Sequence, residues 1–209
     1  IGVWRAAFKP LVDRIADTDI RLQWFCCDRS TGVTDASGKR VTLIRDTKYP
    51  VSVEYQTVKF IGTGRDNIKA GVFSGWELGD YIYLRSEEAY MIKMEALAHK
   101  GSADAITELN SFMKTRQPDY NYTFTNKADL IEEIIYQKRV EFWGEGLEYI
   151  DNRRLNIPVD RTDETWGAEN NNHFSAGKFR YNQEERPFLY QLPLSEIENN
   201  SQLSPTDQN

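Results

Sequence analysis

Two glutamates four residues apart, Glu141 and Glu145, are the side chains in this sequence whose type and spacing best suit acid–base chemistry. Glycoside hydrolysis uses two carboxyl groups that flank the sugar bond. On one helix, residues four apart point the same way, so this pair is badly placed to enclose a substrate. The nearby basic residues that can neutralise the pair are Lys138, Arg139, Arg153 and Arg154. The pattern therefore favours a structural ion-pair network, and we predict no catalytic residue.

Metal and nucleophile chemistry has little support in the residue types present. His99 and His173 are the only histidines, and neither has a cysteine or a second histidine at metal-ligand spacing. They also leave little room for a Ser/His or Cys/His nucleophile. Oxygen ligands for calcium are present without the order of a calcium-binding loop; they are Asp160, Asp163, Glu164, Glu169 and Asn170. A solvated acidic loop is the preferred interpretation, and we expect no metal and no cofactor.

Several aromatic residues suit sugar recognition, in which a flat ring packs on the sugar and amides bind its hydroxyl groups. Trp166, followed by Asn170 and Asn171, is the best candidate, and Trp76 and Trp24 come next. Core packing is the competing interpretation for each tryptophan, because such a ring covers about 150–250 Å². A further alternating aromatic cluster, which can equally cap the neighbouring helices, consists of Tyr120, Tyr122 and Phe124.

The composition is that of a folded domain that does not bind nucleic acid. The chain has 209 residues, 40% of them hydrophobic, which is enough for a sizeable core. Its net charge of -6 disfavours contact with a phosphate backbone. The glycine-rich segment 62–79 matches neither nucleotide-binding fingerprint. The chain starts with Ile1 rather than Met, so we expect that an N-terminal portion carrying an export signal or lipid anchor is absent.

Helical periodicity dominates the middle of the chain. Apolar residues three and four apart predict helices over 84–97 and 105–116. Gly101 is a good left-handed stop between them, and Ser102 is a candidate N-cap. The short connection makes this a helical hairpin of the tetratricopeptide type. Asn126 is then expected to cap the longest helix, which runs to Ile150 with a bend or close helix contact at Gly144 and Gly146.

The flanking regions are less regular. A short helix is predicted over 4–15, a loop over 24–38 and a small strand hairpin between 40 and 60. Turn-forming residues after Asn152 predict an irregular C-terminal segment. The predicted fold is mainly α, with tetratricopeptide-like helical hairpins, long irregular loops and a small β-hairpin. We expect one region over 1–209, divided into a loop- and strand-rich segment (1–80), a helical scaffold (81–155) and an irregular segment (156–209).

Three stretches in order carry a family resemblance: 83–110, 139–154 and 192–209. Their motif residues include Arg85, Glu88, Glu95, Arg139, Glu141, Glu145, Asp151, Arg153 and Arg154. Together these stretches resemble the C-terminal portion of the SusD/RagB family of outer-membrane nutrient-binding lipoproteins. Two departures affect local ion pairs: Gln137–Lys138 stands where the family favours Glu–Arg, and Glu148 where it often has a basic residue.

The resemblance implies a cell-surface glycan-binding subunit that is not an enzyme. Its implied partners are an oligosaccharide or other nutrient ligand and a SusC-like TonB-dependent transporter. The implied location is the outer membrane, reached only through an N-terminal lipid anchor absent from this chain. Two other functions stay open: a tetratricopeptide-like module that binds a peptide, and a glycosidase that uses Glu141.

Overall fold

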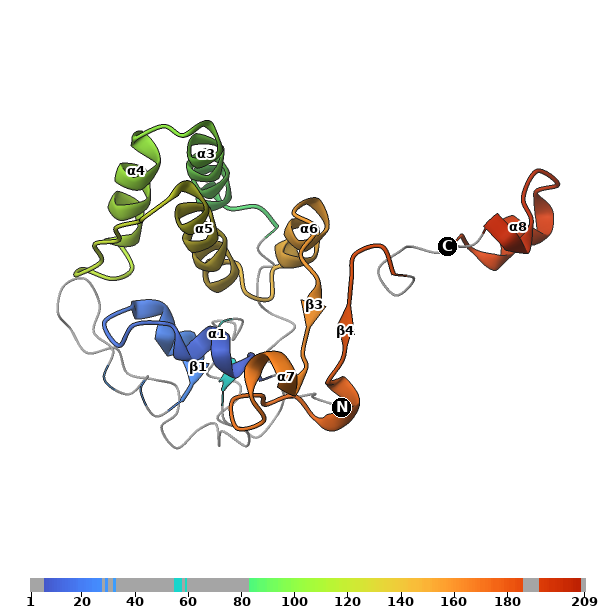
Figure 1. Cartoon of the computed structure of the whole chain (residues 1–209), viewed down its shortest axis with the longest axis horizontal. Helices are drawn as coiled ribbons and strands as arrows, with labels where there is room; N and C mark the ends of the chain where they lie inside the picture. Colours follow the sequence, from blue (N-terminus) through green and yellow to red (C-terminus); the bar gives the residue numbers. More distant parts are fainter. Residues whose placement is uncertain are drawn as a thin grey trace, which may run out of the picture. The chain divides into compact units, whose positions relative to one another are not determined.

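The computed structural model describes residues 6–27, 29, 32, 55–57, 59, 83–185 and 192–207. The strand positions predicted between 41 and 53, the glycine-rich segment 62–79 and Trp76 lie outside these residues. The chain divides into two compact units, Ile1–Glu145 and Gly146–Asn209, each with helices and a small sheet (Figure 1). None of the described helices is long and apolar enough to cross a bilayer.

The first unit is mainly helical, as the sequence predicts. Its elements are α1 (Lys9–Asp13), the 3₁₀ helix η1 (Ile20–Trp24), β1 (Phe25–Cys26), β2 (Gln56–Thr57), α3 (Ser86–Lys100), α4 (Asp104–Met113) and α5 (Lys127–Glu141). Helix α3 packs against both α4 and α5, and Figure 1 shows the three side by side. Strand β1 pairs antiparallel with β2, Phe25 opposite Thr57. The loop predicted at Phe25 was wrong, because its strand partner lies far along the chain and leaves no local pattern.

The α3–α4 hairpin closes as its glycine predicts. Gly101 adopts a φ of 72°, and its N–H donates to the carbonyl oxygen of Ala98 at 3.0 Å. Glycine takes this left-handed conformation without steric cost. Ser102 is not the N-cap of α4, which is Ala103, but its hydroxyl accepts from the N–H of Asp104 at 3.2 Å. The buried side chains that join the two helices are Met91, Met94, Ala98, Ala105, Leu109 and Met113.

Helix α5 begins where predicted and ends earlier. The Asn126 side chain accepts from the N–H of Asp129 at 3.1 Å, and the Asp129 carboxylate accepts from the N–H of Asn126 at 3.3 Å, which completes a capping box. The predicted single helix to Ile150 was wrong. Gly144 and Gly146 have φ values of 78° and 88°, outside the helical region, so the helix ends at Glu141 rather than bending.

The N-terminal segment supplies a second core beside α5. The short helix α1 has Pro10 in its first turn and is shorter than the predicted span of 4–15. Proline fits this position because the first helical N–H groups have no intrahelical partner. The core that this segment forms with α5 is built from the buried residues Ala7, Val12, Ile15, Leu22, Phe25, Cys27, Tyr55, Tyr136 and Val140.

The second unit has more regular structure than predicted. Its elements are α6 (Leu147–Arg154), β3 (Val159–Asp160), α7 (Asp163–Trp166), η4 (Ser175–Gly177), β4 (Arg180–Tyr181), α8 (Leu194–Asn199) and η6 (Pro205–Asp207). Strand β3 pairs antiparallel with β4, Val159 opposite Tyr181. These strands of two residues are too short to show an alternating sequence pattern.

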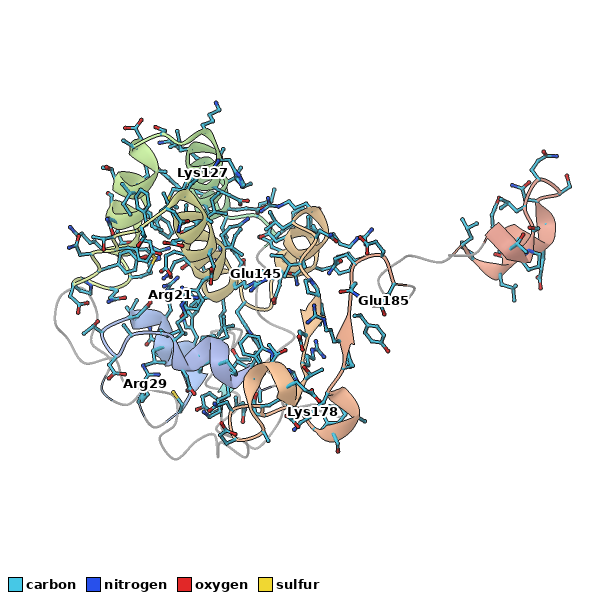
Figure 2. The ribbon with its side chains drawn as sticks, viewed as in Figure 1. Arg21, Arg29, Lys127, Glu145, Lys178 and Glu185 are labelled. Atoms are coloured by element: carbon cyan, nitrogen blue, oxygen red, sulfur yellow. The ribbon has the colours of Figure 1, made fainter. Side chains whose placement is uncertain are left out.

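A buried charge cluster ties the segments of the first unit together, and Figure 2 labels two of its members, Arg21 and Glu145. We call it the Glu141 cluster; it comprises Asp19, Arg21, Lys59, Arg85, Arg116, Gln137, Glu141 and Glu145. Glu141 and Arg21 have side chains only 1% exposed. The Glu141 carboxylate accepts from Arg85 at 2.9 Å, from Arg116 at 3.1 Å and from Arg21 at 3.4 Å.

The rest of the cluster holds the end of α5. Glu145 accepts from Lys59 at 2.6 Å and from Arg85 at 2.9 Å. Both cations also donate to the backbone carbonyl oxygen of Glu141, Lys59 at 2.6 Å and Arg85 at 2.9 Å. Cations at a helix C-terminus stabilise its unpaired carbonyl groups. The cluster therefore fixes both the position of α5 and the residue at which it ends.

Electrostatics keep Glu141 ionised. Burial raises the pKa of this carboxyl group, but hydrogen bonds and charge from Arg116, Arg21 and Arg85 outweigh burial and hold the pKa below its ordinary value of 4.5. Burial lowers the pKa of Lys59, and the neighbouring Arg85 lowers it further against the opposing effect of Glu145.

Replacing Glu141 by alanine should destabilise the first unit by about 3–5 kcal/mol, because the buried arginines lose their shared counter-charge. Urea unfolding followed by circular dichroism measures the change. The matched control is Glu132→Ala on the same helix, whose exposed side chain should matter by no more than about 0.5 kcal/mol. Equal midpoints for the two variants would contradict a stabilising role for the cluster.

The same carboxylate predicts a dependence on pH. Since the pKa of Glu141 is lower in the folded chain than its ordinary value of 4.5, its stabilisation is complete above that value and is lost as the pH falls through the folded pKa. Unfolding free energies measured between about pH 3 and pH 6 should therefore fall more steeply towards acid in the wild type than in Glu141→Ala. Parallel curves would show that Glu141 titrates alike in the folded and unfolded chain.

Candidate functional site

A pocket of about 330 Å³ opens between the N-terminal segment and the connection from α4 to α5. We call it the tyrosine pocket. Three short stretches line it: Arg14, Ile15, Ala16 and Asp19 after α1; Gln117, Asp119, Tyr120, Asn121 and Tyr122 between α4 and α5; and Glu133, Tyr136 and Gln137 on α5. All three stretches belong to the first unit. Its volume lies at the small end of the range for ligand pockets, about 300–1,000 Å³.

Two stacked rings form one wall of the tyrosine pocket. Tyr120 and Tyr122 lie with their ring centroids 6.5 Å apart and their planes 19° from parallel. Asn110 on α4 holds this wall in place. Its side-chain amide donates to the Tyr122 carbonyl oxygen at 3.1 Å and accepts from the Tyr122 N–H at 2.8 Å. The amide thus pairs with both backbone groups of Tyr122 and fixes a segment that has no regular secondary structure.

A buried carboxylate, Glu133, stands at the back of the pocket. One of its oxygens accepts from the Tyr120 hydroxyl at 2.8 Å and from the Gln137 amide at 2.6 Å. The other accepts from Arg14 at 2.5 Å. Gln137 in turn accepts from Arg21 at 2.5 Å. The pocket is therefore joined to the Glu141 cluster through one amide side chain.

Arg14 covers one side of the pocket. Its guanidinium carbon lies 3.9 Å from the centroid of the Tyr136 ring, a cation–π geometry, and its side chain is 46% exposed. Burial raises the pKa of Tyr120 and of Tyr136, and the charge of Glu133 raises both further. The two phenols therefore keep their protons and act as hydrogen-bond donors at neutral pH.

This set of side chains suits a polar ligand that has an apolar face. The tyrosine rings offer flat surfaces, and the carboxylate, guanidinium and amide groups offer both donors and acceptors. A sugar ring has these properties. Sequence reasoning noticed Tyr120 and Tyr122 but missed the pocket, because its remaining walls come from distant segments.

A sequence model of the SusD family matches residues 15–209. The chain belongs to the SusD family. This confirms the resemblance found in the three sequence motifs.

One solved structure similar to this SusD-family chain is described as a SusD-like carbohydrate-binding protein from Bacteroides vulgatus ATCC 8482. The two sequences are 26% identical, and the TM-score is 0.48. The similarity covers 61% of this chain and 30% of that protein, so the matched region spans less than a third of that protein's length. A comparison with curated proteins found no match.

The predicted sugar-binding residues of this SusD-family chain lie in both units. Trp166, in α7, is 38% exposed, and its indole N–H donates to the Asp160 carbonyl oxygen at 2.9 Å. Asn171 is buried and donates to the Arg161 carbonyl oxygen and to Asp163, at 2.9 and 2.8 Å. Its amide donors therefore hold the loop. Asn170 is exposed, and its amide lies 3.4 Å from Glu169.

The other two tryptophans are separate from this loop in sequence. Trp24, in η1, packs against the core of the first unit, and Lys59 lies 4.7 Å from its ring centroid. Trp76 lies outside the described residues. Ligand contact by Trp166, Asn170, Asn171, Trp24 or Trp76 stays a prediction.

The acidic loop residues are engaged with neighbouring side chains. Asp160 accepts from the hydroxyl groups of Thr162 and Thr165, both at 2.7 Å, and pairs with Arg180 at 3.1 Å. Asp163 pairs with Lys178 at 2.7 Å. Among the described residues, no group of three or more His, Cys, Asp or Glu side chains is placed to hold a metal ion.

Most of the motif residues take part in ion pairs, which lie in separate places. Arg85, Glu141 and Glu145 meet in the Glu141 cluster, where the partners of Glu141 include Arg21 and Arg116, which the sequence analysis did not name. Elsewhere in the first unit, Lys138 pairs with Glu95 at 3.1 Å, Glu88 lies half-buried in the first turn of α3, and Arg139 lies half-buried on α5. In the second unit, Asp151 pairs with Arg154 at 2.7 Å, and Arg153 donates to the carbonyl oxygen of Gln183.

Removing the two hydrogen bonds between the Asn110 side chain and the backbone of Tyr122, which we call the clamp, should loosen the pocket wall. The variant Asn110→Ala should lose about 1–2 kcal/mol of stability, because two backbone groups of a half-buried residue lose their partner. Hydrogen exchange should become faster at the Tyr122 amide before the rest of the unit opens. Ser111→Ala, a change at the next, exposed residue, is the control. Unchanged exchange at Tyr122 would contradict the clamp.

Proposed function

We propose that this chain is part of a cell-surface binding subunit that captures an oligosaccharide and delivers it to a SusC-like TonB-dependent transporter of the outer membrane. Membership in the SusD family supports the proposal. The observation that carries it furthest within the chain is the tyrosine pocket, which is lined by three tyrosines and a buried carboxylate. The helices of 81–155 are proposed as scaffold and the connecting segments as the parts that meet the ligand.

The state of Glu141 and Glu145 supports binding rather than hydrolysis. A general acid in glycoside hydrolysis needs a raised pKa so that it holds a proton at neutral pH. The pKa of Glu141 is instead lowered by the surrounding arginines. Arg85 binds both carboxylates, at 2.9 Å each, so the pair is enclosed in its own ion pairs.

The capture step is tested by glycan binding. A glycan array identifies oligosaccharides that bind the chain, and isothermal titration calorimetry measures their dissociation constants. Tyr122→Ala should weaken binding about tenfold or more, because it removes half of the stacked wall. Phe124→Ala removes an exposed ring from the same connection outside the pocket and should leave affinity unchanged.

The outcomes separate the alternatives. If Tyr122→Ala and Phe124→Ala change glycan binding equally, the binding site is not the tyrosine pocket. Peptide capture without any glycan binding would favour the tetratricopeptide-like interaction module. For the transport step, purification of the tagged protein from its native membrane should bring a TonB-dependent transporter with it, and its absence would contradict that role.

A further inference from the structure

The tyrosine pocket carries more negative than positive charge. Three of its lining residues are carboxylates, Asp19, Asp119 and Glu133, and one is a cation, Arg14. Asp19 and Glu133 are buried, and Arg21 behind the wall neutralises Asp19 at 2.7 Å. Asp119 is exposed, and one of its oxygens accepts from Thr18 at 2.7 Å.

Two more acids on α5 extend this negative field. Burial raises the pKa of Tyr122, and the charges of Glu133, Asp129 and Glu132 raise it further, with Arg14 opposing them. The field at the stacked wall is therefore set mainly by carboxylates. An anionic ligand would be repelled here, and a neutral one would gain nothing from the excess charge.

Arg14 shows which chemical group fits the pocket. Its guanidinium lies between the Glu133 carboxylate, at 2.5 Å, and the face of the Tyr136 ring, at 3.9 Å. A carboxylate on one side and an aromatic face on the other are what an organic cation binds best. The Arg14 side chain is 46% exposed and follows the last turn of the short helix α1, so it can turn into solvent on its flexible stem. A ligand cation can then occupy the same position.

We infer that the tyrosine pocket selects sugars that carry a protonated amino group over otherwise identical neutral sugars, with Arg14 as an internal competitor for the same position. The inference rests on the proposed function, because it names the class of glycan that the same pocket takes. The ammonium group would pair with Glu133, and the sugar ring would pack on the tyrosine faces. Asp119 at the rim would attract a second ammonium group of a longer chain.

Three β-1,4-linked tetrasaccharides test this selectivity: those of glucosamine, N-acetylglucosamine and glucose. They share one backbone and differ at the second carbon of each ring, which carries an ammonium, an amide or a hydroxyl group. Titration calorimetry at about pH 6 keeps the amines protonated. The glucosamine tetramer should bind about tenfold or more tightly than either neutral tetramer.

Opposite effects of two pocket variants locate the preference. Glu133→Gln should reduce the affinity for the glucosamine tetramer about tenfold, and the affinity for the glucose tetramer much less. Arg14→Gln should increase the affinity for the glucosamine tetramer several-fold, because the internal cation no longer competes. Asp119→Asn, at an exposed position that does not endanger folding, should give a smaller loss than Glu133→Gln.

Two control variants distinguish an effect of position within the pocket from an effect of the net charge of the chain. Glu164→Gln and Lys100→Gln change the charge of the chain by the same amounts at exposed positions outside the pocket. Both should leave the affinity for all three tetramers unchanged. If the control variants change the affinities as much as the pocket variants do, the acidic chain attracts polycations in general, and the inference is overturned.

The inference and the proposed function fail in different ways. The amino-sugar preference is overturned if the three tetramers bind with equal affinity. It is also overturned if any neutral glycan from the array binds in the pocket more tightly than the glucosamine tetramer does. Neither result contradicts glycan capture. Loss of that glycan's binding in Tyr122→Ala identifies pocket binding. A chain that binds none of the tetramers and no arrayed glycan contradicts both.

Discussion

One buried carboxylate, Glu141, holds the first unit together. Three arginines donate to it from segments far apart in the chain: Arg21 before the first sheet, Arg85 before α3 and Arg116 after α4. Such a group is costly to bury alone and is stable only when its partners are all present. The charges of the cluster are therefore balanced only when the α3–α4 hairpin, the N-terminal segment and α5 are all in position.

The same network reaches the tyrosine pocket. Arg21 donates to Gln137, and Gln137 donates to Glu133, so the position of the pocket carboxylate depends on the cluster behind it. Asp19, a pocket residue, is paired with Arg21 as well. Scaffold and pocket are thus joined by hydrogen bonds that run through Arg21 and Gln137 to the buried carboxylates Asp19 and Glu133. This arrangement gives rigidity to a pocket whose front wall has no helix or strand of its own.

Local signals allowed the helices to be predicted from sequence, and long-range pairing explains what was missed. The apolar spacing over 84–97, the stop at Gly101 and the cap at Asn126 act within one or two turns, so the sequence displays them directly. The predicted apolar set did not give the buried face correctly, because Leu84 and Ile92 are exposed whereas Met94 and Ala98 are buried. The end of α5 was mispredicted because a glycine pattern does not reveal whether φ becomes positive. The β1–β2 pairing and the burial of Arg21 depend on partners far along the chain, and an isolated arginine in a sequence looks solvated. The pocket was missed for the same reason, although two of its three tyrosines, Tyr120 and Tyr122, were noticed.

Gln137 stands where the SusD/RagB pattern favours glutamate, and its hydrogen bonds give this departure a meaning. The side chain must donate to one neighbour, Glu133, and accept from another, Arg21, at the same time. An amide does both, whereas an ionised carboxylate at 137 could accept from Arg21 but would have no hydrogen to donate to the carboxylate of Glu133. The amide at position 137 thus links the acid at the back of the pocket to the buried arginine behind it without placing two carboxylates side by side.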